Sequence, residues 1–336
     1  MGIGYTHRVT ELTMQSIPIV PIVGGGPAGM SCALWLKNYG LKPIIIERVA
    51  ALGGMARLSP YPNDGLLGRP GATARENAAE FARHIEQAGI ETWLEVWLRR
   101  AERRADGTFA LGLQSEHPPF TSSLACPVMV IATGTEFRGR EWLGVVENAR
   151  RLAERRRVHL GPTWVGEPGA ELGSHIAVIG GGDNAFDVSR MLAEKGVAVT
   201  IVMRSREPHA RPQMVDALRP HQVSGQAILL AGRTVAALEE AGDRVRVRLD
   251  DGEELVVDHV VLLLGYQPNT TEPWVSDLAL ERNAGGYLIV DGNMETSCRG
   301  VFAVGEVANP KHPNIVTAIA SGTMAAREIQ RRLVVG

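Results

Sequence analysis

The sequence predicts an α/β fold with two separate doubly wound parallel sheets, because one local pattern occurs twice. Each copy has an apolar strand, a glycine-rich turn, a helix and a second strand, which together form the β-α-β unit of such sheets. The first copy spans residues 22–47 and the second spans residues 176–202. Their turns begin at Gly24 and Gly180, too far apart for neighbouring repeats of a solenoid. We therefore expect two Rossmann-like domains.

The length and composition fit two globular domains of ordinary size. The chain has 336 residues, 45% hydrophobic and 21% charged, with a formal net charge of -2. Such a charge gives no general attraction to nucleic acid or an anionic membrane, and no apolar run approaches the roughly 20 residues that cross a bilayer. Three widely separated cysteines fit a reducing cytoplasm and offer no metal or disulfide framework. We expect a cytoplasmic protein without a metal, nucleic-acid or membrane partner.

Two further apolar runs indicate how the domains are connected. Residues 128–134 and 260–265 are buried-strand patterns that end in glycine, and each is followed by polar, turn-rich sequence. We place a crossing between the domains at each of these points. The second domain is then inserted within the first, so that residues 1–137 and 268–336 form one domain and residues 138–267 form the other.

The first glycine turn has the features of a dinucleotide site. Gly24 permits a tight bend, Gly26 lets the backbone approach a pyrophosphate, and Gly29 lets the helix lie close to the strand. The start of the helix presents unpaired N–H groups and a partial positive charge to the phosphates. Glu47 ends the second strand, where an acid accepts hydrogen bonds from a ribose.

The second turn repeats this arrangement with Gly180, Gly182 and Ala185, but no acid ends its second strand. The residues that follow are basic and include Arg204, Arg206 and Arg211. Guanidinium groups at this place suit a ribose 2′-phosphate, which favours NADP(H) over NAD(H) without excluding the latter. The alternative is a solvated basic loop that follows a strand.

The ordered motifs resemble the low-molecular-weight thioredoxin reductase-like family, and most of all its cysteine-free branch, the thioredoxin reductase-like ferredoxin–NADP reductases. The similarity runs from Ile19 to about Leu333 and rests on residues 24–29, 52–54, 131–134, 180–187, 265–270, 300–306 and 317–326. The resemblance implies the three-layer (ββα) class II pyridine nucleotide-disulfide oxidoreductase fold and a homodimer. It further implies FAD in the first domain and the pyridine nucleotide in the inserted one.

The resemblance also assigns residues near the flavin. Glu306 stands where the family has an aspartate that contacts the ribityl chain, and Met55 stands where it usually has glutamine. Asn314, Ile315 and Thr317 would lie beside the isoalloxazine, at the start of the last long helix. The cofactor contacts that we expect are Gly24, Gly26, Pro27, Ala28, Gly29, Glu47, Arg48, Gly54, Met55, Thr133, Gly134, Glu306, Asn314, Ile315 and Thr317 in the first domain, and Gly180, Gly182, Asp183, Asn184, Ala185, Arg204, Arg206 and Arg211 in the second.

Two departures from the family matter. Gly161 and Trp164 occupy the places of the two redox cysteines, so thiol–disulfide exchange is not expected. Trp164 either stacks near the flavin or fills the volume, and we favour filling. Pro21 falls within the first central strand, where a missing N–H is costly unless the strand begins late.

We predict an FAD-dependent NAD(P)H oxidoreductase that passes hydride from NADPH to FAD and electrons onward to an external acceptor. The acceptor is expected to be an acidic ferredoxin, a flavodoxin or a small molecule. The arginine-rich run at 150–157 would then serve as a docking patch or simply as a solvated helix face, the latter being favoured. The alternative is a flavoprotein that uses no pyridine nucleotide, either a small-molecule oxidase or a flavin-binding sensor.

Three histidines are candidate proton donors for a small-molecule substrate: His159, His209 and His312. Of these we favour His312. The simpler interpretation is that they are surface histidines without a catalytic role.

Overall fold

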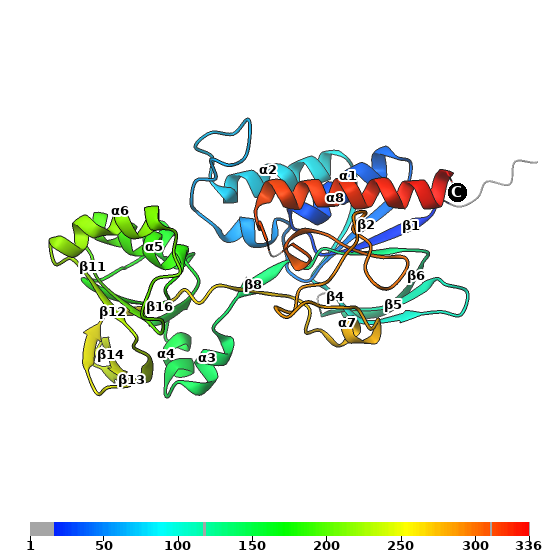
Figure 1. Ribbon diagram of the computed structural model, residues 1–336. Helices are drawn as coiled ribbons and strands as arrows, with labels where there is room; N and C mark the ends of the chain where they lie inside the picture. The colour runs from blue at the N-terminus through cyan, green and yellow to red at the C-terminus, as the bar shows by residue number, and fades with distance from the viewer. Residues whose placement is uncertain (1–16, 117–118, 310, 336) are drawn as a thin grey trace, which may run out of the picture.

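The computed structural model describes residues 17–116, 119–309 and 311–335, which form two lobes joined by two chain crossings (Figure 1). The first lobe contains a five-stranded parallel sheet in the order β18-β7-β1-β2-β3. Its strands are β1 (Ile19–Val23), β2 (Lys42–Glu47), β3 (Glu91–Leu94), β7 (Met129–Ile131) and β18 (Val301–Ala303).

Two layers cover this sheet and bury its apolar residues. One face packs against helices α1 (Pro27–Asn38), α2 (Ala74–Gln87) and α8 (Ile315–Gln330), which Figure 1 shows side by side. The other face packs against an antiparallel sheet of β4 (Val96–Arg103), β5 (Phe109–Glu116) and β6 (Pro119–Cys126), and against α7 (Pro273–Asp277). The strands of the parallel sheet are apolar on both faces because each face meets a core.

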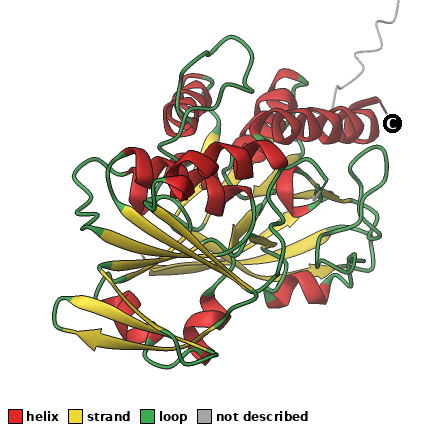
Figure 2. Cartoon of the chain, turned by 60° about the vertical axis from the view of Figure 1, so that its left-hand side comes forward, coloured by secondary structure: helices red, strands yellow, loops and turns green. Residues whose placement is uncertain are grey.

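The second lobe repeats this plan. Its parallel sheet has the order β12-β11-β10-β16-β9, and Figure 2 shows its strands between two further layers of structure. These strands are β9 (Val158–Leu160), β10 (His175–Ile179), β11 (Ala198–Met203), β12 (Ala227–Ala231) and β16 (His259–Leu262). Helices α5 (Asp183–Glu194) and α6 (Pro212–Val223) lie on one face. The other face meets β13 (Val235–Ala241), β14 (Arg244–Leu249), β15 (Glu254–Val257), α3 (Arg140–Val145) and α4 (Ala149–Glu154).

The lobes are joined by a two-stranded antiparallel ribbon of β8 (Thr135–Phe137) and β17 (Tyr266–Pro268). The expected domain limits at residues 137 and 268 lie within this ribbon. Short helical turns complete the structure: η1 (Gly54–Leu58), η2 (Trp164–Gly166), η3 (Gly305–Val307) and η4 (Arg331–Val335). In the described part of the chain, no helix is both long enough and apolar enough to cross a membrane.

Strand β1 accommodates Pro21 without beginning late. It starts at Ile19, pairs with β2 along its whole length, and pairs with β7 only at Ile22 and Val23. The N–H of Gly24 donates to Ile46 in β2, so Pro21, three positions earlier, turns its nitrogen to the other side. On that side the recorded pairing with β7 begins only at Ile22, and the missing N–H therefore costs no bond of that ladder.

Candidate functional site

A cavity of about 630 Å³ lies at the carboxyl ends of the central strands of the first lobe, which is the usual place for ligands in open α/β sheets. It is large enough for a sizeable cofactor. The expected residues that line it are Gly24, Gly26, Pro27, Ala28, Glu47, Arg48, Gly54, Met55, Thr133, Gly134, Glu306, Asn314 and Ile315. The fold thus gathers segments separated by almost the whole chain.

The first glycine turn leaves room for a diphosphate. Gly24 has a φ of 113°, and a Cβ atom there would overlap the carbonyl oxygen of Ala132. A Cβ atom at Gly26 would meet nothing closer than the Cα of Gly54, at 3.9 Å. Helix α1 begins directly afterwards without a side-chain cap. Its first N–H groups are therefore available to an anion, so the turn fits the diphosphate of a dinucleotide.

Gly29 has a packing role and lies outside the lining of the cavity. A Cβ atom there would overlap the carbonyl oxygen of Gly24 and approach Ala132 to 3.2 Å. Glycine at this position therefore lets α1 lie close to β1, as the sequence predicts.

Glu47 is buried at the end of β2 and holds the turn in shape. Its Oε2 atom accepts the N–H of Gly25 at 2.7 Å, and its Oε1 atom accepts the N–H of Val49 at 3.1 Å. A carboxylate has about four acceptor positions. Two acceptor positions remain for ribose hydroxyls, so Glu47 can support the turn and bind a ligand at the same time.

Residues near the other end of the cavity come from η3 and the start of α8. Glu306 accepts a hydrogen bond from the hydroxyl of Thr135 at 2.7 Å, and Asn314 caps α8 by accepting the N–H of Thr317 at 3.0 Å. The Thr317 hydroxyl donates to the carbonyl of His312 at 2.8 Å, and the residue is not part of the lining. The structure therefore places Thr317 in the capped first turn of α8, outside the lining of the cavity, and its contact with the flavin ring stays a prediction.

Several lining residues are absent from the sequence-based site. Phe137 and Tyr266 come from the two strands of the connecting ribbon, with ring centroids 5.2 Å apart. Pro162 and Thr163, which follow β9, also line the cavity. One signal in the sequence could have found the aromatic pair, because each ring follows one of the two apolar runs that end in glycine.

The second glycine turn has the same construction as the first. Gly180 has a φ of 149°, and a Cβ atom there would overlap the carbonyl oxygen of Leu263. A Cβ atom at Gly182 would meet nothing within 4 Å, while Ala185 is fully buried against the sheet. Helix α5 begins at Asp183 without a side-chain cap. This turn also fits a diphosphate, although it lies outside the lining of the 630 Å³ cavity.

The three arginines after β11 differ in their surroundings. Arg204 and Arg206 are exposed. Arg211 binds Asp183 through both its backbone N–H and its Nε atom, each at 2.7 Å, so the first residue of α5 already neutralises it. The next residue, Asn184, donates from its side-chain amide to the Tyr266 hydroxyl at 3.2 Å. The second turn is thereby attached to a residue that lines the cavity.

Trp164 fills volume within the second lobe and is not part of the cavity lining. Its ring stacks on His159, with centroids 3.7 Å apart and planes inclined by 3°, and lies 4.5 Å from the ring of His259. The two histidines face each other, with His159 Nε2 and His259 Nδ1 3.1 Å apart. Burial, followed by repulsion from His259, lowers the pKa of His159 to about 3. His159 is thus a packed, neutral side chain rather than a proton donor.

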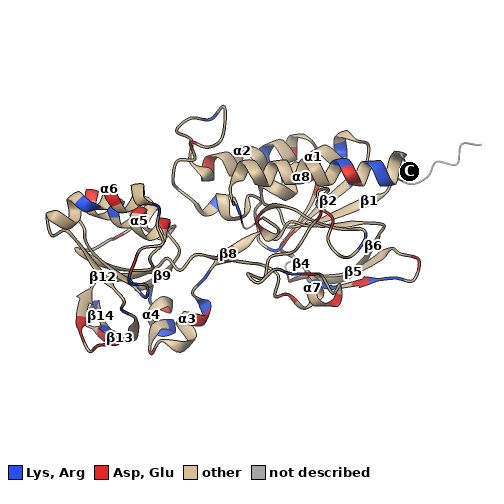
Figure 3. Cartoon of the chain, in the orientation of Figure 1, with Lys and Arg blue, Asp and Glu red and all other residues tan. Residues whose placement is uncertain are grey.

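The remaining histidine candidates lie on the surface. His209 and His312 are exposed, and neither lines the cavity. Figure 3 shows both signs of charge around α3 and α4, and the arginine-rich run at 150–157 begins in α4. Arg151 and Arg155 pair with Glu240 of β13 at 3.3 and 2.9 Å. These pairs favour the solvated face over the docking patch.

No cysteine is placed for dithiol chemistry. Cys32 and Cys126 are buried, Cys298 is half-buried, and all three are unpaired. Burial raises the pKa of Cys126 to about 12 and raises the pKa of the other two thiols as well. Thiol–disulfide exchange requires thiolates, and these are therefore scarce at neutral pH.

Comparisons with known proteins show the family and the fold of this chain. The family model of the pyridine nucleotide-disulphide oxidoreductases matches residues 19–322. The chain is 29% identical over 312 residues to a ferredoxin–NADP reductase from Ignicoccus hospitalis, covering 90% of this chain and 94% of that protein. It is 27% identical over 315 residues to a ferredoxin–NADP reductase from Limosilactobacillus reuteri, covering 92% and 90%. The thioredoxin reductase of Lactococcus lactis, in its FR conformation, superposes with a TM-score of 0.77 at 24% identity, covering 95% of this chain and 99% of that one.

These matches confirm the expected α/β fold with its two dinucleotide-binding units, and they confirm the resemblance on which the flavin assignment depends. They also favour the main functional prediction over the alternative of a flavoprotein without a pyridine nucleotide. With a family model spanning nearly the whole chain, the protein belongs to the pyridine nucleotide-disulphide oxidoreductase family, as an FAD-dependent NAD(P)H oxidoreductase.

Proposed function

We propose that the protein takes hydride from NADPH and delivers electrons to a small acidic carrier of the ferredoxin or flavodoxin type. The observation that carries the proposal is the pair of glycine turns, each open at its second glycine and followed by an uncapped helix. Two such turns suit two dinucleotides. The unpaired, largely protonated cysteines argue against a disulfide acceptor.

In this proposal the first lobe holds FAD, which supplies the centre that accepts a hydride and releases electrons singly or in pairs. Gly26 and the start of α1 bind the diphosphate, and Glu47 accepts the ribose hydroxyls. Glu306 accepts a hydrogen bond from a hydroxyl group of the ribityl chain. The start of α8, capped by Asn314, directs its partial positive charge at the ring end of the cavity, where negative charge collects on reduction.

The second lobe holds the nucleotide at Gly182 and the start of α5. Arg204 and Arg206 are exposed just beyond β11, at the place where a 2′-phosphate would lie, and they favour NADPH over NADH. We expect Arg204→Ala to raise the KM for NADPH about tenfold, equivalent to about 1.4 kcal/mol, and to leave the KM for NADH within twofold. Equal effects on both nucleotides would contradict this specificity.

We further propose that residues 1–137 and 268–336 form the FAD domain and residues 138–267 the nucleotide domain, the two meeting at the β8–β17 ribbon. A homodimer in the cytoplasm completes the proposal. Its mass can be measured by light scattering, and a monomer at micromolar concentration would overturn that part.

Two matched glycine variants test the cofactor assignment. The Cβ atom of a valine at Gly26 or Gly182 meets no close neighbour and no left-handed backbone, so both variants should fold. We expect Gly26→Val to purify colourless, because its branched side chain fills the place of the diphosphate. We expect Gly182→Val to remain yellow but to resist reduction by NADPH under anaerobic conditions, while dithionite still reduces it.

The wild-type flavin should lose its yellow absorption within seconds of anaerobic NADPH addition. Acceptors can then be compared: ferredoxin, flavodoxin, quinones, oxygen and protein disulfides. Fast reduction of an acidic carrier that slows as salt is added supports the proposal. A flavin that stays oxidised in both NADPH and NADH would overturn it, and so would efficient reduction of a protein disulfide.

A further inference from the structure

The two lobes touch away from the connecting ribbon. The hydroxyl of Tyr61, in the loop between η1 and α2, donates to the carbonyl oxygen of Pro162 at 2.7 Å. The neighbouring Pro60 packs tightly against Gly166, where a Cβ atom would overlap the Pro60 Cγ and would lie 3.3 Å from both the Pro60 Cβ and the Tyr61 ring. One short loop of the first lobe thus contacts both ends of the segment 162–166 in the second.

The segment 161–166 makes a third contact with the region between the lobes. Gly161 has a φ of 77°, and a Cβ atom there would lie 2.5 Å from the ring of Phe137, a residue of the ribbon that lines the cavity. Pro162 and Thr163 line the same cavity. This segment stands where thioredoxin reductases carry their two redox cysteines, and here it forms a contact surface instead.

The Tyr61 hydroxyl is suited to permanent donation. Its burial, followed by the negative charge of Asp187 in α5, raises its pKa well above the ordinary value. The group therefore stays protonated across the physiological range, and a carbonyl oxygen can only accept. Loss of the hydroxyl proton therefore does not break this hydrogen bond near neutral pH.

The orientation that these contacts hold places the second glycine turn beside the cavity. Asn184, the second residue of α5, donates to the hydroxyl of Tyr266, whose side chain lines the cavity. Asp187, one turn further along α5, is the residue whose charge reaches Tyr61. Both tyrosines therefore face the same end of the same helix.

We infer that the loop at Pro60 and Tyr61 and the segment 161–166 form a latch between the lobes, which makes Tyr61 a positioning residue for hydride transfer. In the proposed function the first lobe binds FAD and the second binds NADPH. The rate of hydride transfer therefore depends on how often the two lobes hold the flavin and the nicotinamide in the correct relative orientation. The inference rests on the proposed function, but the contact itself can be tested without any nucleotide.

A disulfide across the latch provides that test. The Cβ separation of 3.3 Å between positions 60 and 166 lies just below the roughly 3.5–4.5 Å found in disulfides. Gly166 has no positive φ that would resist substitution, and Pro60→Cys removes the ring carbon that would overlap the new Cβ atom. The holoenzyme carrying Pro60→Cys and Gly166→Cys is oxidised with diamide and mapped by mass spectrometry. We expect the 60–166 disulfide in most molecules, and no internal cross-link in either single variant.

The cross-linked enzyme then shows what the orientation does. We expect NADPH to reduce its flavin within twofold of the rate in the thiol form. Failure of the cross-link to form would overturn the latch. A cross-linked flavin that NADPH no longer reduces, although dithionite does, would show that the contact belongs to an unproductive orientation and would overturn the positioning role.

Tyr61→Phe removes only the hydroxyl, and Tyr39→Phe is its matched control. Tyr39 follows the last residue of α1 beside Trp35, with ring centroids 5.7 Å apart, and is not one of the residues that line the cavity. We expect Tyr61→Phe to slow flavin reduction five- to tenfold with the Kd for NADPH unchanged, since the loss is one hydrogen bond. Tyr39→Phe should leave both quantities unchanged.

Rescue separates positioning from a merely structural role. In the Tyr61→Phe background, the 60–166 disulfide should restore the wild-type rate, and dithiothreitol should abolish the rescue. A wild-type rate in Tyr61→Phe, or a slow rate that the disulfide does not restore, would overturn the inference. If the wild-type flavin is reduced by neither nucleotide, the proposed function fails, while the cross-link yield still decides whether the latch exists.

Discussion

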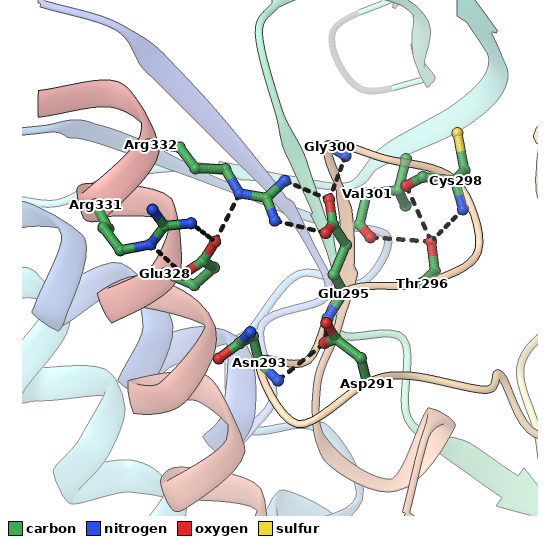
Figure 4. A network of polar contacts seen from close by, with 10 residues as sticks. All are labelled: Asp291, Asn293, Glu295, Thr296, Cys298, Gly300, Val301, Glu328, Arg331 and Arg332. Carbon is green, nitrogen blue, oxygen red and sulfur yellow. Dashed lines mark hydrogen bonds and ion pairs between the residues drawn. The ribbon is translucent and has the colours of Figure 1, made fainter. Parts of the chain in front are cut away.

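The guanidinium group of Arg332 forms a two-point ion pair with the carboxylate of Glu295, which lies in the loop before β18 (Figure 4). The Nε atom of Arg332 also donates to Glu328 at 2.7 Å, and its guanidinium lies 5.3 Å from the centroid of the Phe302 ring. Glu295 in turn accepts the N–H of Gly300 at 2.7 Å. The network fixes the end of α8, the helix whose other end lines the cavity.

Replacing Arg332 with alanine should therefore destabilise the first lobe. The Glu295 side chain is only 14% exposed, so its charge would lose its partner in a poorly solvated place. We expect the free energy of unfolding to fall by about 2 kcal/mol, less than the roughly 3–5 kcal/mol of a fully buried pair, because Arg332 keeps some exposure. Urea unfolding measures the change. Arg299→Ala, at an exposed position, should stay within about 0.5 kcal/mol of wild type, and an equal loss in both would contradict the role of the network.

The same network should make the protein sensitive to acid. Hydrogen bonds from Arg331, then from Arg332, lower the pKa of Glu328 to about 2, and Arg332 lowers the pKa of Glu295. Carboxylates with lowered pKa values stabilise the fold above their unfolded pKa of about 4.5, and this stability is lost as the pH falls from there towards 2. Urea midpoints at pH 5 and pH 3 should differ less in Glu328→Gln than in wild type. Parallel losses in the two proteins would refute this explanation.

The packed histidines of the second lobe should give a second, milder pH dependence. The pKa of His159 is lowered to about 3 and that of His259 is lowered too, in each case first by burial. The folded state therefore binds fewer protons than the unfolded state, and stability is lost as the pH falls from 6.5 towards 3. His159→Phe keeps an aromatic ring stacked on Trp164. Between pH 6.5 and pH 5, this variant should lose about 2 kcal/mol less of its free energy of unfolding than the wild type does. Thermal unfolding measures it, and His84→Gln, at an exposed position on α2, should keep the full dependence.

Replacing Gly161 with a residue that has a side chain, as a cysteine pair would require, should destabilise the protein. Gly161→Ala combines a φ of 77° with a Cβ atom 2.5 Å from Phe137, whereas Gly169→Ala has a φ of 79° and open space around it. Backbone strain alone costs about 1–2 kcal/mol, so the free energy of unfolding of Gly169→Ala should fall by that amount. That of Gly161→Ala should fall by about 1 kcal/mol more, because of the overlap with Phe137. Urea unfolding compares the pair. Equal losses would show that Phe137 moves aside, and would leave room for a cysteine at this position.

The sequence predicted the two β-α-β units because their signals are local. A strand, a glycine turn and a helix lie within a few residues of one another, and each turn needs glycine where a Cβ atom would strike the neighbouring strand. The second unit illustrates the precision: the strand expected at 198–202 is β11 (Ala198–Met203). The helix end expected at Glu194 is the observed one. The connecting β8–β17 ribbon was predictable for the same reason, since an apolar run ending in glycine precedes each of its strands.

The tertiary structure alone decided which distant side chains meet. No periodicity connects Arg332 with Glu295, or Trp164 with His259, because these pairs come from different elements whose packing depends on the whole core. The contact of Tyr61 with Pro162 depends further on how two separate cores are oriented. Local backbone chemistry thus fixed where a dinucleotide can lie, whereas the walls of the cavity and the contacts between the lobes arise only when remote segments are folded together.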